Sequence, residues 1–265
     1  MKKGNSERLR QETFTWSRDS SFEWFSILAH FQVKSVIEVG RPPSLLDLAC
    51  GDGTITYELQ KCFTRVVGVD GSAKQIEKAR QRCPKVEFHI SLIEEFQTEE
   101  RFDTVVMICL LEHVVDPVQT LRAAANHLKP DGILISQVPN ALAVNRRIAR
   151  LMGTLKDEYE LSPWDINVAG HRRSYDMCSL VDNFKSAGLK VISTGGIFYK
   201  MLSTPQMDWF LRNGHWDEGG FGWGRVGAEK KDWKAEFCHA CYEIGKERPE
   251  DCNIIYACAT KWKGR

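Results

Sequence analysis

The sequence predicts an α/β fold built on a parallel sheet that helices cover on both faces. Short, continuous apolar runs alternate with helix signals through the middle of the chain, and further strand-like runs return in its last third. Strands buried on both faces lose the alternation of apolar and polar residues that half-exposed strands show. Strands that alternate with helices in this way are typical of a parallel sheet.

Seven apolar runs predict the strands of this sheet. The first group lies at residues 45–49, 66–69, 86–90, 104–108 and 133–138. The last two runs lie at residues 190–193 and 253–258. The stretch between these last two runs is far longer than an ordinary connection, so we expect an insertion there.

Helix signals lie between and around these runs. Residues 22–39 place apolar side chains near helical spacing and predict an amphipathic lead-in helix. N-cap signals predict three further helices, which begin after Ser72, Asp116 and Asp176. A last helix is predicted over residues 233–245.

Composition excludes several classes of protein. The chain has 36 basic and 35 acidic side chains, a net charge of +1, whereas proteins that neutralise many phosphates usually carry a basic surplus. We therefore expect no nucleic-acid partner. No apolar run approaches the roughly 18 residues of a membrane span, and no secretory signal is apparent. Nine cysteines without regular spacing indicate reduced thiols, so a cytoplasmic location is expected.

The first strand leads directly into a glycine-containing turn and a helix. Gly51 and Gly53 in this turn let the backbone approach a ligand closely and present N–H groups to it. The next strand ends in Asp70, at roughly the twenty-residue distance at which a carboxylate accepts hydrogen bonds from ribose in Rossmann units. A nicotinamide dinucleotide site needs a third glycine, but Thr56 occupies that position, which disfavours this cofactor.

Four segments in register resemble the class I S-adenosylmethionine-dependent methyltransferases. They read DLACGDG, VGVDGS, FDTVV followed by LEHVVDP, and LKPDGIL, all within residues 45–140. The resemblance implies a Rossmann-like, seven-stranded, mostly parallel sheet with helices on both faces and an antiparallel last strand. It also implies a helical lead-in over residues 1–43 and a domain over 44–262, with helical cap insertions at about 141–175 and 197–250.

By this resemblance the chain binds S-adenosylmethionine. The two turn glycines flank the methionine portion, Asp70 holds the ribose, and the residues after the third strand line the adenine. The full set of expected cofactor contacts is Asp47, Ala49, Gly51, Gly53, Asp70, Gly71, Ser91, Leu92, Ile93 and Cys109. The sequence departs from the family pattern twice, because Ala49 replaces the first glycine and no acid follows the third strand.

Two histidines are candidates for the general base of the reaction. His113 follows the fourth strand and His171 follows the fifth, at the sheet edge where ligands bind in open α/β folds. Histidine titrates near neutral pH, as a general base requires. Each histidine also has a structural interpretation: the Glu112–His113 pair recurs in relatives with different chemistry, and His171 lies in a basic turn.

That basic turn supplies further candidates for contact with the methyl acceptor. Arg172 and Arg173 suit bidentate binding of a phosphate or carboxylate, although a solvated turn is an equal alternative. Tyr175 and Lys200 complete the expected acceptor-binding set. An exposed charged helix face is expected for the arginines at positions 146, 147 and 150.

The insertion after residue 197 leaves alternatives open. Its aromatic, glycine-rich part at residues 214–227 suits a mobile lid, a dimer contact or a surface loop. Cys238, Cys241 and Cys252 give only a weak metal-binding spacing, so we expect buried thiols on a helix and no metal.

These observations predict an enzyme that methylates a hydroxyl group of a small metabolite, including sugar-like and phosphorylated ones. N-methylation of a small molecule, other chemistry on the sulfonium and a non-catalytic binding role remain alternatives. The acceptor is the expected partner, no membrane partner is expected, and a homodimer remains open.

Overall fold

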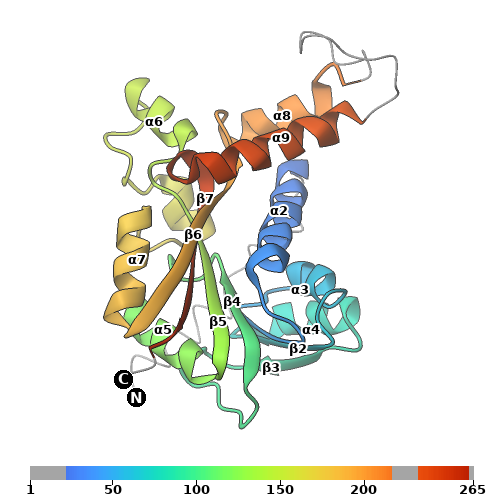
Figure 1. The fold of residues 1–265 in the computed structure, drawn as a ribbon. Helices are drawn as coiled ribbons and strands as arrows, with labels where there is room; N and C mark the ends of the chain where they lie inside the picture. The colour runs from blue at the N-terminus through green and yellow to red at the C-terminus, as the bar shows by residue number, and fades with distance from the viewer. Residues whose placement is uncertain (1–21, 217–231, 263–265) are drawn as a thin grey trace.

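The computed structural model describes residues 22–216 and 232–262, and it places all the predicted strands in one sheet (Figure 1). The seven-stranded sheet has the order β3-β2-β1-β4-β5-β7-β6. Neighbours among β1 to β5 pair in parallel, whereas β7 pairs antiparallel with both β5 and β6. The predicted mostly parallel sheet with an antiparallel last strand is confirmed. The strand bounds are β1 Ser44–Leu48, β2 Arg65–Asp70, β3 Glu87–Ile90, β4 Phe102–Ile108, β5 Leu128–Pro139, β6 Leu189–Tyr199 and β7 Cys252–Lys261.

The helices begin where the capping signals predicted. Ser72 caps α4, Asp116 caps α5 with a proline in its first turn, and Asp176 forms a capping box at the start of α7. Each of these side chains accepts a backbone N–H that has no partner inside its helix. The helix bounds are α2 Glu23–Val39, α3 Thr54–Leu59, α4 Ala73–Arg82, α5 Pro117–Asn126, α6 Val144–Leu151, α7 Met177–Ser186, α8 Thr204–Asn213 and α9 Trp233–Glu247, with a π-helical turn at Asp165–Ala169 and a 3-10 turn at Pro249–Asp251.

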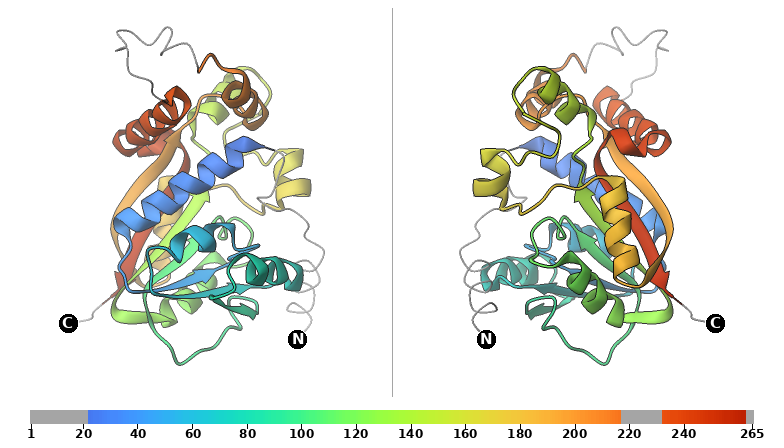
Figure 2. Two further views of the ribbon diagram at one scale, coloured as in Figure 1. Left: turned by 90° about the vertical axis from the view of Figure 1, so that its right-hand side faces the viewer. Right: turned by 90° about the vertical axis from the view of Figure 1, so that its left-hand side faces the viewer.

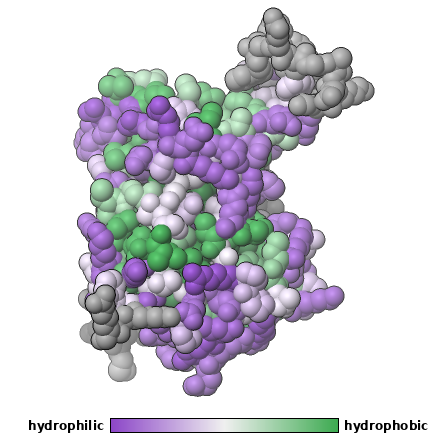
Figure 3. All heavy atoms as spheres, viewed as in Figure 1, coloured by the Kyte–Doolittle hydropathy of each residue, from purple (hydrophilic) through white to green (hydrophobic). Residues whose placement is uncertain are grey.

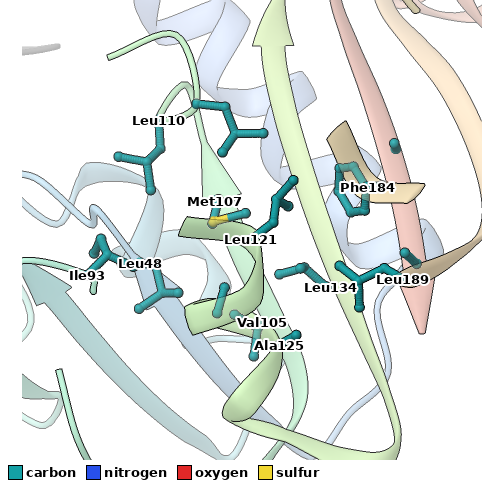
Figure 4. Close-up of a cluster of buried hydrophobic side chains, with 14 of the residues drawn as sticks. Leu48, Ile93, Val105, Met107, Leu110, Leu121, Ala125, Leu134, Phe184 and Leu189 are labelled. Atoms are coloured by element: carbon teal, nitrogen blue, oxygen red, sulfur yellow. The ribbon is translucent and has the colours of Figure 1, made fainter. Parts of the chain in front are cut away.

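Helices cover both faces of the sheet. Alternate residues of β4 face opposite sides: Val105 and Met107 pack with α5 and α7, whereas Val106 and Ile108 pack with α2 and α3. Figure 4 shows Leu121 of α5 lying over the first of these two faces. All four β4 residues are almost fully buried, as a central strand of a doubly covered sheet requires.

Helix α2 is tied to the sheet by polar contacts as well as apolar ones. The side-chain amide of Gln137 on β5 donates to the carbonyl of Gln32 at 3.1 Å and to the hydroxyl of Ser35 at 2.9 Å. All three residues are buried, and a buried amide without partners would be costly. The lead-in helix is therefore part of the packed structure.

Helices α6, α8 and α9 form a cap over one end of the sheet, and this cap rests on α2 (Figures 1 and 2). An aromatic cluster joins α2 to β6 and α9. Trp24 meets Phe198 edge-on with ring centroids 4.9 Å apart, and Phe31 stacks on Tyr242 with ring centroids 4.9 Å apart. Tyr242 of α9 also donates to Glu38 of α2 at 2.9 Å. Helices α6, α8 and α9 lie within the segments where insertions were expected, and most of the glycine-rich segment at 214–227 lies outside the described residues.

The surface is hydrophilic over much of the face seen in Figure 3, with a band of hydrophobic side chains across its middle. Among residues 22–216 and 232–262, no helix is long and apolar enough to cross a membrane. Cys238, Cys241 and Cys252 are buried, and burial raises the pKa of each thiol to about 12. The three thiols are buried as expected, but only Cys238 and Cys241 lie on a helix, because Cys252 begins β7.

Candidate active site

A cavity of about 350 Å³ lies between the carboxyl ends of the parallel strands and the cap. We call the part formed by the ends of β1, β2 and β4 the floor, which includes Asp47, Ala49, Gly51, Asp70 and Cys109. We call the opposite part the cap wall, which includes Trp24, Phe25, Leu28, Arg146, Asp165, His171, Lys200 and Thr204. Glu112 and His113 lie in the loop after β4 and also line the cavity. Its volume is within the range of small-molecule sites.

Two residues of the floor have a backbone conformation that usually requires glycine. Ala49 at the end of β1 has φ +66°, and Cys109 at the end of β4 has φ +53°. This left-handed conformation costs an L-residue roughly 1–2 kcal/mol, and such strain gathers at functional sites. Ala49 replaces the glycine of the family pattern, so the structure shows that this substitution leaves strain in the chain.

The turn glycines differ in what surrounds them. A Cβ on Gly51, at φ +55°, would meet no atom within 4 Å, so the turn leaves open space on that side. A Cβ on Gly53, at φ +77°, would lie 3.0 Å from Ala79 of α4. Gly51 therefore leaves room for a ligand, and Gly53 allows two helices to approach closely.

Asp70 holds the floor together while lining the cavity. One carboxylate oxygen accepts the N–H of Gly51 at 2.9 Å, and the other accepts the N–H of Ser72 at 2.8 Å. Burial raises the pKa of Asp70, and these two hydrogen bonds oppose the shift. Each oxygen of a carboxylate has more than one acceptor site, so the group can bind a diol as well.

Asp47 and Thr56 explain why the third glycine of a dinucleotide site is missing. The Thr56 hydroxyl donates to the Asp47 carboxylate at 2.6 Å, and both side chains are buried. A hydroxyl that supports the floor from below occupies the position where helix and strand would otherwise pack through glycine.

The residues after β3 lie beside the floor without lining the cavity. Ser91 donates its backbone N–H to the carbonyl of Asp70 at 3.0 Å, so this segment is fixed to the end of β2. Gly53, Gly71 and residues 91–93 are not among the cavity-lining residues. Their contact with a cofactor stays a prediction.

His113 and His171 come together, as their predicted places at one sheet edge require. Their ring centroids lie 5.0 Å apart in an edge-to-face arrangement. The Nδ1 of His113 lies 3.3 Å from the carbonyl oxygen of Gly170, and its Nε2 lies 3.8 Å from a carboxylate oxygen of Glu112. The Nδ1 of His171 lies 3.7 Å from a carboxylate oxygen of Asp165.

Glu112, His113 and His171 form the one potential metal-ligand group of this kind among the described residues. One ligand atom from each lies within 4.8 Å of the others. The expectation that the protein works without a metal therefore stays a prediction, and it has a specific site at which to be tested.

Arg172, Arg173 and Tyr175 do not line the cavity. Arg172 donates to the carbonyl of His113 at 2.7 Å, and Arg173 donates to the carbonyls of Leu111 and Val114 at 2.8 and 2.5 Å. The Tyr175 ring is buried beneath the same loop. The structure thus uses these side chains to hold the loop that carries His113, and it gives no support to their expected contact with substrate.

Arg146 corrects another expectation. It lines the cavity instead of standing on an exposed face, and its guanidinium lies 3.6 Å from Asp165. Arg147 and Arg150 do project outward, where they pair with Asp251 and Glu158. Helix α6 therefore presents one arginine to the site and two to its surface.

The sequence shows the family to which the chain belongs. The model of a family described as a methyltransferase domain matches residues 25–194, more than half of the chain. The chain belongs to this family. Like other class I methyltransferases, it uses S-adenosylmethionine as its cofactor.

The relatives with curated names differ in how much they share with this methyltransferase. A ubiquinone biosynthesis O-methyltransferase of Rickettsia canadensis is 25% identical over 179 residues, 66% of this chain and 72% of the relative. A protein of the same name from Bradyrhizobium diazoefficiens is 33% identical over 100 residues, 36% of this chain and only 40% of the relative.

A solved structure agrees over nearly the whole fold. It is the S-adenosylmethionine-dependent methyltransferase of Thermotoga maritima, described as a possible histamine N-methyltransferase. The two structures have a TM-score of 0.58 at 16% identity, with 90% of this chain and 93% of that chain covered. The likeness shows the fold.

The floor of this methyltransferase fits the cofactor of its family. The open space beside Gly51 and the carboxylate of Asp70 belong to one cavity, and their use by the amino-acid portion and the ribose stays a prediction. The motif residues could be found from sequence. The aromatic residues of α2 that line the cap wall could not, because helical periodicity marks an apolar face without saying what covers it.

Proposed function

We propose that this methyltransferase transfers the methyl group of S-adenosylmethionine to a hydroxyl group of a small molecule, with His113 as the general base. The observation that carries the proposal is one continuous cavity, which joins the floor to His113 and to the cap wall. Relatives at low identity are named O-methyltransferases, which favours oxygen as the accepting atom.

The chemical demand on the protein is alignment and removal of one proton. When bound, S-adenosylmethionine supplies an electrophilic methyl carbon, which an acceptor oxygen takes by in-line displacement, with S-adenosylhomocysteine as the second product. Positioning of the two partners contributes on the order of 7–11 kcal/mol in favourable cases. A general base of suitable pKa adds roughly 100- to 10,000-fold for an acceptor that must lose a proton.

The contact of His113 with Gly170 favours one tautomer for the proposed base. A carbonyl oxygen can only accept, so the Nδ1 that faces Gly170 carries the hydrogen. Nε2 is then the nitrogen that takes the proton of the acceptor hydroxyl. The adjacent carboxylate of Glu112, 3.8 Å from Nε2, stabilises the positive ring that results.

His171 is the second candidate base, and its surroundings suit a neutral ring. Burial lowers the pKa of His171, Arg146 lowers it further, and Asp165 opposes both. A neutral imidazole at physiological pH is able to accept a proton. We place His171 in the supporting role because it lies in the cap wall, whereas His113 lies in the loop that follows β4.

The acceptor we propose has an apolar body. Trp24, Phe25 and Leu28 form part of the cap wall, so a ligand there meets aromatic and aliphatic surface. The finer expectation of a sugar-like or phosphorylated acceptor has less support, because Arg172 and Arg173 bind loop carbonyls instead of facing the cavity.

Methyl transfer is tested with purified protein, methyl-labelled S-adenosylmethionine and a panel of hydroxylated and amine metabolites. We expect label on a hydroxylated member of the panel. Label on amines only would contradict the choice of oxygen, and cofactor binding without any transfer would favour the other chemistries.

A further inference from the structure

Lys200 places an amine in the cap wall of the cavity. It directly follows β6, whose residue Phe198 has φ +67°, and only 2% of Lys200 is exposed. Phe198 is itself fully buried in the aromatic cluster of the cap, so the packing fixes the point at which Lys200 enters the cavity. Its position is set by structure, in contrast to a surface lysine.

The amine has few partners of its own. Nζ donates to the hydroxyl of Thr204 at 3.0 Å and lies 4.7 Å from the centre of the Trp24 ring. Over residues 22–216 and 232–262, no ion pair joins it to a carboxylate. An ammonium group has three donors, and the structure supplies one acceptor and one aromatic face.

The other long basic side chain of the cavity is already committed. The Arg146 guanidinium lies 3.6 Å from Asp165 and donates to the carbonyl of Glu158 at 2.9 Å. Lys200 thus differs from Arg146 in having donors that no described carboxylate or carbonyl uses. A buried ammonium group without an anionic partner is unfavourable, because a charge taken out of water needs a partner.

We propose that Lys200 binds a carboxylate of the methyl acceptor, so that the acceptor is a hydroxylated acid with an apolar body. The inference rests on the proposed function, because it concerns the molecule that receives the methyl group. Trp24 packs against the amine and also lines the cavity, so the same contact that holds Lys200 presents an aromatic surface beside the bound acid.

The alternative is a structural lysine held by Trp24 and Thr204 alone. A cation over an aromatic ring is stabilised by up to about 2 kcal/mol when it is desolvated. In that case the amine would have no effect on what the cavity binds. The two possibilities differ in one measurable property, which is a preference for acids over their neutral analogues.

The test uses equilibrium binding to the protein saturated with S-adenosylhomocysteine, which excludes turnover. The probes are 4-hydroxybenzoate, 4-hydroxyphenylacetate and 4-hydroxycinnamate, each paired with its amide, and 4-hydroxybenzylphosphonate as a different anion. We expect calorimetry to show that at least one acid binds about 10- to 100-fold more tightly than its amide, as a charge-assisted hydrogen bond requires.

Variants assign that preference to the amine. Lys200→Met should abolish it, Lys200→Arg should retain part of it, and Lys190→Met, which changes an exposed lysine of β6, should leave it unchanged. Equal affinity of acids and amides in the wild type, including no measurable binding of either, would overturn the proposal. So would a preference that survives in Lys200→Met, and tight binding of the phosphonate alone would replace carboxylate by phosphate. Because no turnover is measured, a failed methyl-transfer assay leaves this result readable.

Discussion

The floor and the cap wall of the cavity are built by different means. The floor comes from consecutive segments of chain, and its contacts are mainly made by backbone: the N–H groups of Gly51 and Ser72 bind Asp70, and Ala49 and Cys109 bend the chain at two strand ends. The cap wall comes from α2, from residues 140–171 and from 200–204, and it presents side chains. We therefore expect the cofactor to meet a surface defined by backbone and the acceptor to meet one defined by side chains.

The largest effect should come from the residue where the two parts meet. We expect His113→Ala to lower kcat by roughly 100- to 10,000-fold while the affinity for S-adenosylmethionine stays unchanged, because the base acts on the acceptor alone. His239→Ala, an exposed histidine of α9, is the matched control. A near-normal rate in His113→Ala, with a large loss in His171→Ala, would move the base into the cap wall.

Lys200, which lies in the cap wall, should make the free energy of unfolding depend on pH. Burial lowers the pKa of Lys200 to about 7, and its neighbours Trp24 of α2 and Thr204 of α8 do not titrate in this range. The unfolded chain therefore holds more protons above pH 7, so stability rises with pH from about 7 to the usual lysine pKa near 10.4.

We expect Lys200→Met to raise the unfolding free energy by roughly 3–5 kcal/mol below pH 7, with a gain that shrinks as the pH approaches 10. Denaturant titrations at several pH values measure it, with Lys190→Met as the control. A gain that does not vary with pH would mean that the amine keeps an ordinary lysine pKa in the folded protein, as a solvated amine does.

A substitution at Asp70 should weaken binding of the cofactor and leave the preference of the cap wall for an acid unchanged. Asp70→Asn should weaken binding of S-adenosylmethionine by about 1.5–3 kcal/mol through loss of a charge-assisted contact. The preference for an acid over its amide, measured on the same variant, should persist. Asp103→Asn serves as the control, because Asp103 lies near the start of β4 and does not line the cavity. Unchanged cofactor affinity would refute the ribose assignment.

The strained positions of the floor give a smaller effect of opposite sign. Ala49→Gly should stabilise the protein by up to about 1 kcal/mol, because release of left-handed strain exceeds the entropy that glycine loses on folding. Ala149→Gly, within α6, should instead destabilise by about 1 kcal/mol. If both substitutions destabilise equally, the conformation at position 49 carries no strain.

Treatment with a metal chelator should have the smallest effect, because methyl transfer is expected to need no metal. Zinc ligands at about 2.1 Å from an ion lie nearer to one another than the 3.8 Å between Glu112 and His113, and the methyl carbon needs no Lewis acid. We expect methyl transfer to be unaffected by a chelator. Activity that falls with chelation and returns with a divalent cation would assign Glu112, His113 and His171 as ligands.

The same comparison explains what the sequence could predict. The sheet, its capped helices and the motif residues Gly51 and Asp70 follow from local patterns that act over a few positions. Arg173 has the composition of a phosphate clamp, but whether it reaches a ligand or the carbonyl of Leu111 depends on packing between segments far apart in the chain. The place of Arg146 in the cavity also depends on a distant segment, because its guanidinium pairs with Asp165.

The contact between α2 and α9 has a consequence for synthesis of the protein. By the time residue 110 has left the ribosome, every segment of the floor exists, and early segments generally fold first. Trp24 and Phe31, on the aromatic side of α2, pack on Phe198 and Tyr242, which are translated much later. We therefore expect the nascent chain to expose this apolar helix face through much of its elongation.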